Sequence, residues 1–491
     1  MAAAPVIQPK RPAHIETRLF INGKFKDASD GKTFKIINPT TLEVVADVAE
    51  ATVQDTNEAV AAAKAAFPAW RDLGQAARAA PMRKLAQLIR DNAAELAYLE
   101  AVSMGRPVAT FDFDVSIGAD HFETYASAAW LSTGKTSLHT PGQIHMTLRQ
   151  PYGVVAGIIP WNLALLFFCW KAAPALAVGN TVVIKTSERA PLTCARVAEM
   201  INEAGFPPGV FNVLSGHGNP SGVTLAEHMD VRAISFTGSL RTGRLISAAA
   251  AKSNLKSVIL ELGGKSPMVV FDDCDVQKAA GDASISINAF AGQMCMASSR
   301  IFVQDTIVDE FISALKTNFS MTKTGDPLDP ATHRGPQVDE QQVNVVNGYI
   351  PSGKDSGAQI AFQGPVPDDG GKGHFIPATV FLNADHDSPM MREEIFGSVT
   401  NIATFATEEE ALSRANDTEF GLYASVYTKD VQRAMRFAKG MEAGTVGVNV
   451  TSPTCSRDLA FGGWKSSGSG REGIAESLDH FLEVKTVVMH V

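Results

Sequence analysis

Apolar and polar side chains alternate along residues 18–50, which is the spacing of short, half-buried strands. The pairs Asn22-Gly23 and Asp30-Gly31 interrupt this alternation. Such pairs favour tight turns between paired strands, because both residues tolerate a positive φ. The pattern predicts a small β region with two hairpins.

Helical spacing replaces the alternation further along. Ala and Leu recur at helical intervals over residues 56–67 and 76–103, and residues 111–131 continue as a long amphipathic helix. We interpret these helices as a scaffold.

From residue 154 onward, short apolar runs alternate with helical segments. The expected strands are residues 154–159, 181–185, 211–214, 232–236 and 257–262. The expected helices between them are residues 163–177, 194–204, 223–228 and 239–252. Such alternation predicts an α/β fold, with an open, doubly wound parallel sheet of the Rossmann type and helices on both faces. A second strand and helix series begins with residues 301–304 and 309–317 and ends near residues 444–450.

Residues 154–170 are nearly all apolar and resemble a membrane span. Pro160 and Asn162 interrupt the run and Lys171 ends it, so a buried strand, a turn and a buried helix fit better.

Polar residues follow each strand of the first series. They are Pro160-Trp161-Asn162, then Lys185-Thr186-Ser187-Glu188, then Gly216-His217-Gly218 with Gly222, then Thr237-Gly238-Ser239, and finally Glu261. In parallel sheets ligands bind at the carboxyl ends of the strands, so these residues are expected at one nucleotide-binding edge.

Each of these signals has a plain structural alternative. Ser239 is equally typical of a helix N-cap and of a helix end that faces a pyrophosphate. Lys185 and Glu188 could form a surface pair, although a carboxylate after the second strand suits a ribose diol. Asn162 could only satisfy turn backbone, and Gly216 to Gly222 departs from the dinucleotide glycine pattern.

A carboxylate and a thiol lie in one stretch of the chain. Glu261 ends an apolar run, and Cys295 follows in a Gly-Gln-Met-Cys turn. Together they offer a general base and a nucleophile. Taken singly, Cys295 is more typical of a small core residue and Glu261 of a solvated strand end, so the case for chemistry depends on what else converges here.

Composition narrows the function classes. A chain of 491 residues has room for two or three domains, and 45% hydrophobic with 19% charged residues is typical of a soluble globular protein. The net charge of −9 argues against a nucleic-acid partner. The 5 cysteines are scattered without ligand spacing, so we expect no metal site, no disulfide framework and a reducing compartment. Three prolines in the first 12 residues weaken a mitochondrial presequence, which favours the cytoplasm.

Six motifs together resemble the aldehyde dehydrogenase superfamily, in its hydrolytic, NAD(P)-dependent branch. They are PWN at 160–162, KTSE at 185–188, FTGS at 236–239, ELGGK at 261–265, GQMC at 292–295 and EEIFG at 393–397. They occur in the family's order, and the similarity extends from about residue 20 to residue 487. Two departures are Ser398 in place of the usual Pro and Phe290 in place of a common Asn.

The resemblance implies three parts and a set of residue roles. Residues 1–130 and 152–263 would bind NAD, residues 264–459 would form an α/β catalytic domain, and residues 131–151 and 476–491 would form a β oligomerisation arm. Cys295 would be the nucleophile, Glu261 the base for deacylation and Asn162 an oxyanion donor. The implied NAD contacts are Ile159, Pro160, Trp161, Lys185, Ser187, Glu188, Gly218, Gly222, Phe236, Thr237, Gly238, Ser239, Gly243, Leu262, Gln342, Glu394 and Phe396. NADP would bind more weakly.

The resemblance also implies an apolar substrate pocket and self-association. The pocket positions are Leu166, Phe167, Trp170, Met294, Met296, Cys455 and Phe461, which favour an aliphatic or aromatic aldehyde. The arm implies a homodimer or homotetramer, with no nucleic acid or membrane partner. Two alternatives are an acylating relative that passes the acyl group to coenzyme A and a non-catalytic structural relative.

Overall fold

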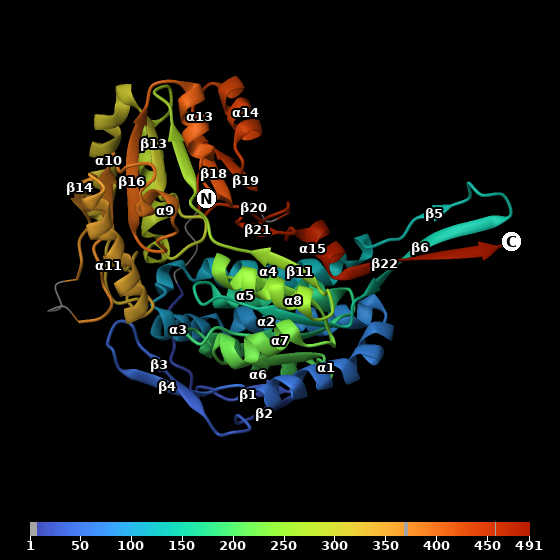
Figure 1. The fold of residues 1–491 in the computed structure, drawn as a ribbon. Helices are drawn as coiled ribbons and strands as arrows, with labels where there is room; N and C mark the ends of the chain where they lie inside the picture. Colours follow the sequence, from blue (N-terminus) through green and yellow to red (C-terminus); the bar gives the residue numbers. More distant parts are fainter. Residues whose placement is uncertain (1–6, 368–371, 457) are drawn as a thin grey trace.

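The protein is described here by a computed structural model covering residues 7–367, 372–456 and 458–491. Two α/β units meet along one side, and a thin three-stranded arm projects from the lower unit (Figure 1). Residues 1–6 of the N-terminal segment, in which a presequence was considered, lie outside the described residues.

The first sheet contains the predicted parallel strands. Its order is β2-β1-β9-β8-β7-β10-β11-β21, and the strands from β9 to β11 run parallel. Their bounds are β1 Leu19–Ile21, β2 Lys24–Lys26, β7 Val154–Ile158, β8 Thr181–Lys185, β9 Phe211–Leu214, β10 Val231–Thr237, β11 Ser257–Glu261 and β21 Gly468–Ser469. The doubly wound architecture is confirmed, and an antiparallel hairpin extends one edge.

Helices cover both faces of this sheet, because successive side chains of a strand point to opposite faces. Val154 and Ala156 of β7 pack with one set of helices, whereas Val155 packs with the other. The first set is α1 Val53–Asp72, α7 Val223–Glu227 and α8 Leu240–Lys252. The second set is α5 Ala164–Ala177 and α6 Leu192–Ala204, with α2 Gln75–Asp91, α3 Ala93–Met104 and α4 Asp112–Ala128 behind them.

The apolar run of residues 154–170 is the predicted strand, turn and helix. Every residue of α5 is buried, because protein surrounds the helix on all sides. A helix in such a position is apolar over almost its whole circumference. Within the described ranges, no helix is both long enough and apolar enough to cross a bilayer.

The single helix predicted over residues 76–103 is wrong, because Asn92 divides it into α2 and α3. The Asn92 side-chain amide donates to the carbonyl oxygen of Leu88 at 2.8 Å. Asn competes in this way with the helical backbone, and here the competition ends one helix and starts another.

The Asn22-Gly23 turn joins β1 to β2 as predicted, with φ of 52° and 75°. The second predicted hairpin, at Asp30-Gly31, is wrong, because the strands on its two sides lie in different sheets. β3 Thr33–Ile37 pairs instead with β4 Val44–Ala49. Gly31 does adopt the positive φ of a turn, but a turn alone does not decide which two strands pair.

The second sheet has the order β14-β15-β16-β13-β12-β18-β19, with only β14 antiparallel among its described strands. Its strands are β12 Pro267–Val270, β13 Arg300–Gln304, β14 Gln359–Gln363, β15 Thr379–Leu382, β16 Val399–Phe405, β18 Tyr423–Tyr427 and β19 Thr445–Val448. One face carries α9 Val276–Asn288 and α10 Val308–Met321, and the other carries α11 Glu340–Asp355, α12 Pro389–Arg392, α13 Glu408–Asn416 and α14 Val431–Gly440. A short pair, β17 Phe420–Gly421 and β20 Trp464–Lys465, adjoins it.

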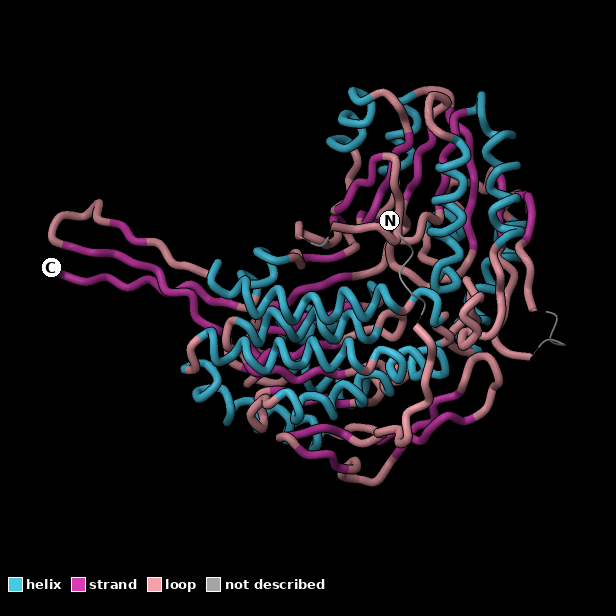
Figure 2. The backbone as a smooth tube through the Cα atoms, turned by 180° about the vertical axis from the view of Figure 1, so that it is seen from behind, coloured by secondary structure: helices cyan, strands magenta, loops and turns pink. Residues whose placement is uncertain are grey.

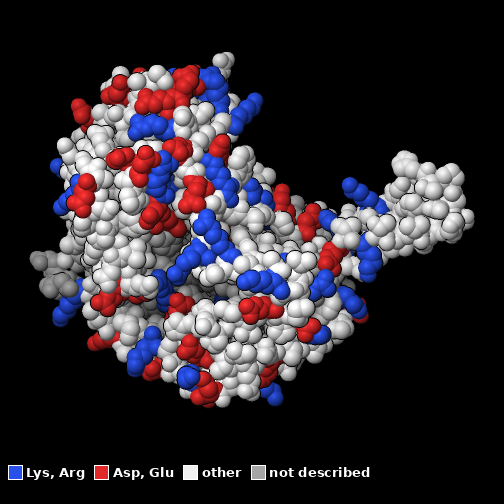
Figure 3. Space-filling model, in the orientation of Figure 1, with Lys and Arg blue, Asp and Glu red and all other residues white. Residues whose placement is uncertain are grey.

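The arm is an antiparallel sheet of three strands that stands away from the body (Figure 2). Its strands are β5 Thr136–Ser137, β6 Gln143–Pro151 and β22 Leu482–His490, and α15 Ile474–His480 precedes the last of them. Leu138, Val488 and Val491 on it are 70%, 57% and 77% exposed. Figure 3 shows both signs of charge mixed over the body and almost no charge at the outer end of the arm. Exposed apolar strands of this kind are usually covered by a partner.

Gly243 illustrates how closely α8 approaches the sheet. A Cβ at this position would lie 2.7 Å from Leu262 Cδ2, so Gly243→Ala must displace the leucine or the helix. We expect this change to lower the free energy of unfolding by about 1–3 kcal/mol, measured as a lower Tm by calorimetry. The control is Gly222→Ala, since nothing lies within 4 Å of its Cβ position and its backbone is helical. Equal losses in both variants would contradict this account of the packing.

Candidate active site

A cleft of about 520 Å³ lies where the carboxyl ends of the first sheet face the second unit. Most residues expected in the site line this cleft. They are Ile159, Pro160, Trp161, Asn162, Phe167, Lys185, Ser187, Glu188, Gly218, Phe236, Thr237, Gly238, Ser239, Glu261, Cys295, Gln342, Glu394 and Phe396. The convergence expected from the strand ends is therefore present in three dimensions.

Three residues expected among the cofactor contacts lie outside the cleft lining. Gly243 and Leu262 touch one another behind it, and Gly222 belongs to the turn that leads into α7. The contribution of Gly243 and Leu262 is therefore to the packing of α8 on the sheet, whereas no atom of the described residues around it lies within 4 Å of the Cβ position of Gly222.

Cys295 lines the cleft after a tight turn and is 9% exposed. A Cβ on Gly264 would lie 2.4 Å from the Cys295 carbonyl oxygen, so the glycine backbone packs directly against Cys295. Burial, together with the carboxyls of Glu261 and Glu394, raises the pKa of the Cys295 thiol well above its usual value. The thiol is therefore protonated at neutral pH in this arrangement.

Glu261 stands at the end of β11 and is 1% exposed. Neither carboxyl oxygen of Glu261 forms a hydrogen bond of acceptable distance and angle with the described residues. The Cys295 thiol is nevertheless close enough to lower the pKa of Glu261. Burial dominates and raises the pKa of Glu261 to about 8, while Lys171 opposes the rise and Glu472 adds to it. A carboxyl with such a pKa can exchange a proton near neutral pH.

A buried ion pair beside Glu261 was not anticipated. Lys171 Nζ lies 2.5 Å from Glu472 Oε1, and the two side chains are 0% and 7% exposed. The backbone of Glu472 also pairs with Phe461. The signal for this pair in the sequence is Lys171 itself, a lysine within an otherwise apolar helix.

Asn162 is 4% exposed and its Nδ2 donates to the Gln293 carbonyl oxygen at 2.9 Å. This bond uses one of the two amide hydrogens, and the second is left for another acceptor in the cleft. The bond also ties the strand end of the first sheet to the turn that carries Cys295.

The far part of the cleft contains groups that suit a dinucleotide. Burial lowers the pKa of Lys185 to about 8, while the nearby Glu188 carboxylate opposes this shift. Glu394 accepts the Gly264 N–H at 3.1 Å, and burial raises its pKa to about 7. Its carboxyl occupies the space that a side chain on Gly263 would need, with Oε2 only 2.0 Å from that Cβ position.

The N-terminus of α8 faces the same part of the cleft. The Ser239 hydroxyl accepts the Thr242 N–H at 3.3 Å, so the expected alternative of an N-cap is also true. The Thr237 hydroxyl is buried without a hydrogen-bond partner among the described residues. An orphan hydroxyl beside a helix N-terminus fits an anionic group such as a pyrophosphate. Arg189, Arg241, Thr242, Gly263 and Gln341 also line the cleft and were not foreseen.

The residues expected in a substrate pocket belong to or pack on the same apolar cluster as Cys295, and Phe167 among them lines the cleft. The ring centroids of Phe167 and Trp170 are 6.0 Å apart, and those of Trp170 and Phe461 are 5.9 Å apart. Leu166, Phe167, Trp170, Met294, Met296 and Phe461 are buried in one apolar cluster, against which Cys455 packs.

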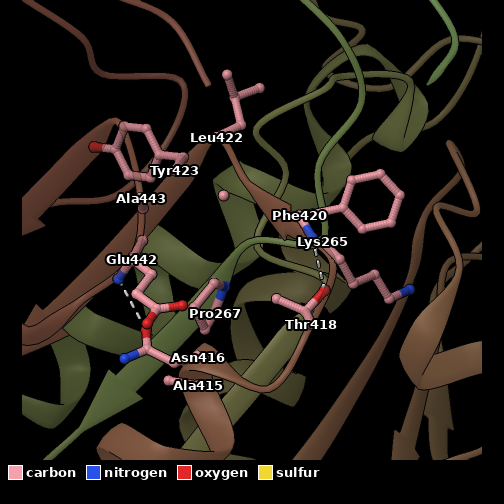
Figure 4. A pocket seen from close by; sticks show the side chains of 12 residues that line it. Lys265, Pro267, Ala415, Asn416, Thr418, Phe420, Leu422, Tyr423, Glu442 and Ala443 are labelled. Carbon is pink, nitrogen blue, oxygen red and sulfur yellow. Dashed lines mark hydrogen bonds between the residues drawn. The ribbon is translucent and has the colours of Figure 1, made fainter. Parts of the chain in front are cut away.

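A second cavity, of about 10 Å³, lies away from this chemistry (Figure 4). In it Asn416 accepts the Glu442 N–H at 2.9 Å, and Thr418 accepts the Phe420 N–H at 3.3 Å. It has room for about one water molecule, so it belongs to the packing of the second unit.

Comparisons with known proteins agree with this site. The sequence profile described as "Aldehyde dehydrogenase family" matches residues 25–487. An aldehyde dehydrogenase of Davidiella tassiana is 42% identical over 472 residues, which cover 96% of this chain and 95% of that protein. The crystal structure of the aldehyde dehydrogenase KauB from Pseudomonas aeruginosa has a TM-score of 0.95 at 38% identity, covering 97% of each chain. The P. syringae indole-3-acetaldehyde dehydrogenase AldA, solved with NAD+ and IAA, has a TM-score of 0.94 at 39% identity, again covering 97% of each chain.

A doubly wound sheet with a dinucleotide-type cleft and a buried thiol beside a buried carboxyl defines the class as NAD(P)-dependent oxidoreductases. The chain belongs to the aldehyde dehydrogenase family. It is accordingly an oxidoreductase that acts on aldehydes with NAD(P).

The raised pKa of Cys295 can be tested by alkylation. We expect the rate of carboxamidomethylation of Cys295 in the cofactor-free protein to keep rising above pH 9, because only the thiolate reacts. In Glu261→Gln the neighbouring carboxylate is gone, so the apparent pKa should fall and the rate at pH 9 should increase. Mass spectrometry of the Cys295 peptide separates this signal from the other cysteines. A titration midpoint below 8 in the unsubstituted protein would contradict the account.

Proposed function

We propose that the chain oxidises a medium aliphatic or aromatic aldehyde to its carboxylic acid, with NAD preferred to NADP. The observation that carries the proposal is that Cys295, Asn162 and Glu261 line the same cleft as the dinucleotide-type residues. A thiol, an amide donor and a titratable carboxyl are the groups that covalent aldehyde oxidation requires.

Cys295 is the nucleophile, and its sulfur bonds to the aldehyde carbon. The thiol, which its raised pKa keeps protonated at neutral pH, first loses its proton to solvent, and the thiolate sulfur then adds to the carbonyl carbon. Negative charge develops on the carbonyl oxygen, where the second amide hydrogen of Asn162 and the Cys295 backbone N–H can donate. Each such donor contributes about 3–4 kcal/mol to the transition state.

The cofactor residues hold NAD, which accepts a hydride from the substrate carbon when bound. Lys185 and Glu188 would bind the adenine ribose, Glu394 the nicotinamide ribose, and the N-terminus of α8 the pyrophosphate. The orphan Thr237 hydroxyl and the buried Glu394 carboxyl support this assignment.

Oxidation leaves the acyl group on Cys295 as a thioester, and Glu261 removes it. The carboxylate takes a proton from water, the water oxygen bonds to the acyl carbon, and the carbon–sulfur bond breaks. The pKa of about 8 makes Glu261 a stronger base than an exposed carboxylate, at the cost of a smaller ionised fraction at neutral pH.

The apolar cluster of Leu166, Phe167, Trp170 and Phe461 supports an apolar substrate. Met294 and Met296 flank the nucleophile and shape this approach. A panel of aldehydes differing in length and charge would identify the preferred chain, and a preference for dicarboxylic semialdehydes would overturn the proposal.

Domain and assembly assignments belong to the same proposal. Residues 1–130 and 152–263 bind the cofactor, residues 264–459 carry the nucleophile, and the arm of residues 131–151 and 476–491 pairs two copies in a homodimer or in a tetramer of two dimers. The exposed apolar strands of the arm support self-association. We propose the cytoplasm as the location.

Transfer of the acyl group to coenzyme A is the competing function. The position of Glu261 in the cleft favours hydrolysis, since an acyl transfer to a thiol needs no water-activating base. NADH release that depends on added coenzyme A would favour the alternative, and no NADH release under either condition would indicate a non-catalytic relative.

Replacing Glu261 by Gln should separate acylation from deacylation. We expect a burst of NADH close to one equivalent per active site, followed by turnover at least about 100-fold slower, because the amide cannot accept a proton from water. Stopped-flow absorbance measures both phases. Cys295→Ala is the control and should give no burst while still binding NAD. Full steady-state turnover in Glu261→Gln would exclude this residue as the base.

Replacing Glu188 tests the cofactor preference. A carboxylate beside the ribose repels a 2′-phosphate, so Glu188→Gln should raise the ratio of kcat/KM for NADP to that for NAD about tenfold, or about 1.4 kcal/mol. The exposed Glu203→Gln is a matched control outside the cleft and should leave the ratio unchanged. Equal use of the two cofactors by the unsubstituted protein would contradict the role of Glu188.

A further inference from the structure

Three successive residues before the nucleophile have left-handed backbone. The φ angles are 52° at Phe290, 54° at Ala291 and 73° at Gly292. Glycine adopts this conformation freely, and Gly292 also lacks room for a side chain, since its Cβ would lie 2.2 Å from the Gly397 carbonyl carbon. For Phe and Ala the conformation costs roughly 1–2 kcal/mol each. The surroundings must therefore hold the turn in place.

The guanidinium of Arg106 stacks on the Phe290 ring. Its central carbon lies 3.3 Å from the ring centroid, and the two residues are 1% and 7% exposed. Arg106 Nη2 donates to Asp114 Oδ1 at 2.8 Å, whereas Nε and Nη1 have no hydrogen-bond partner among the described residues. The Phe290 ring thus covers the face of a guanidinium whose Nε and Nη1 groups have no hydrogen-bond partner among the described residues, and desolvated cation–π pairs are the strong ones.

Arg106 keeps its positive charge at the pH of catalysis. Burial lowers its pKa to about 10, while Asp114 and Glu100 oppose the change. Burial raises the pKa of Asp114 to about 6 and that of Glu100 to about 8. Near pH 7 the cluster therefore holds the Arg106 cation, with Asp114 mostly ionised and Glu100 mostly protonated.

The backbone that carries Arg106 is fixed against the second unit. Gly105 ends α3 with φ 81°, and its Cβ would lie 2.6 Å from Pro336 Cγ. The Pro336 carbonyl oxygen in turn accepts Gln293 Nε2 at 3.4 Å, and Gln293 Oε1 accepts the Val338 N–H at 2.9 Å. Arg106 and the turn before Cys295 thus rest on the same segment, residues 336–338.

We propose that Arg106 is a positioning residue for the nucleophile: its stacking on Phe290 holds the left-handed turn, and the turn places both Cys295 and the Gln293 carbonyl that orients the Asn162 amide. The 2.9 Å bond between Asn162 and Gln293 transmits the position of the turn to the oxyanion donor. The proposal rests on the proposed role of Cys295 in aldehyde oxidation.

Two substitutions remove the stacking from opposite sides. Arg106→Met removes the cation, and Phe290→Leu removes the aromatic face while leaving the pair of Arg106 with Asp114 intact. Both should lower kcat about 10–100-fold while changing KM for NAD less than about threefold, because most of the expected cofactor contacts lie at the strand ends of the first sheet and at the start of α8 rather than on the turn. Phe290→Leu keeps the experiment decisive if Arg106→Met does not fold, since full activity of the leucine variant would overturn the proposal.

Phe290→Asn provides the rescue. Asn adopts left-handed backbone most readily among residues with a side chain, so the turn should form without the stacking. We expect this variant to keep kcat within about fivefold, and Arg106→Met to cost less than about threefold when added to it. The effect of Arg106→Met on kcat should thus be about tenfold smaller in the Phe290→Asn background than in the unsubstituted protein. This difference corresponds to a coupling free energy of about 1.4 kcal/mol. If Arg106 only stabilises the fold, Arg106→Met should lower Tm by the same amount and kcat by the same factor in the unsubstituted protein and in Phe290→Asn. That result would overturn the proposal.

The alkylation rate of Cys295 separates this proposal from the proposed function. Arg106→Met and Phe290→Leu should change that rate and Phe290→Asn should restore it, with or without aldehyde oxidation. If the unsubstituted protein shows no oxidation but the coupled change in alkylation is present, the function fails and the positioning role stands. If oxidation is normal and the alkylation rates of all variants are equal, the positioning role fails alone.

Discussion

Two glycines carry the chain from the first sheet to the second, and the width of the catalytic cleft depends on them. Gly263 and Gly264 lie between β11 and β12, one residue after the end of β11, so they join the last parallel strand of one sheet to a central strand of the other. A side chain on Gly263 would overlap the Glu394 carboxyl, and one on Gly264 would overlap the Cys295 carbonyl oxygen. The close contact of bare backbone with these two residues brings Glu261, Glu394 and Cys295 into one cleft.

Burial in the cleft also shifts the pKa values of its ionisable side chains. It raises the pKa of Glu261 to about 8 and that of Glu394 to about 7, and it lowers that of Lys185 to about 8. Groups that would otherwise titrate far from neutrality are thereby brought close to it, so a substrate or cofactor charge can redistribute protons among them. The buried Lys171–Glu472 pair lies within electrostatic reach of the base and opposes part of this shift through its lysine.

The position of the nucleophile depends on segments far apart in the sequence. The turn before Cys295 contacts Arg106 at the end of α3, the segment at residues 336–338, and Asn162 after β7. A strained turn that is held from several sides is well suited to catalysis, because the reacting sulfur and the amide donor cannot relax independently. The N-terminal helices that look like scaffold in the sequence therefore reach the active site.

The sequence alone determined the succession of strands and helices along residues 154–262. This succession follows from local periodicity and from residues that end or begin a helix, such as Gly205 and the Ser239 cap. It also placed Glu261 and Asn162 at one edge, since residues at the carboxyl ends of parallel strands share that edge, whereas the place of Cys295 in the site came from the resemblance to a family. Their catalytic roles came from the resemblance to a family rather than from spacing. Only the tertiary structure decided that Asn92 divides a helix, that Gly243 serves packing, that Lys171 pairs with Glu472, and that Arg106 stacks on Phe290. Each of these depends on burial or on a contact between distant segments, and neither property is encoded in the local pattern of residues.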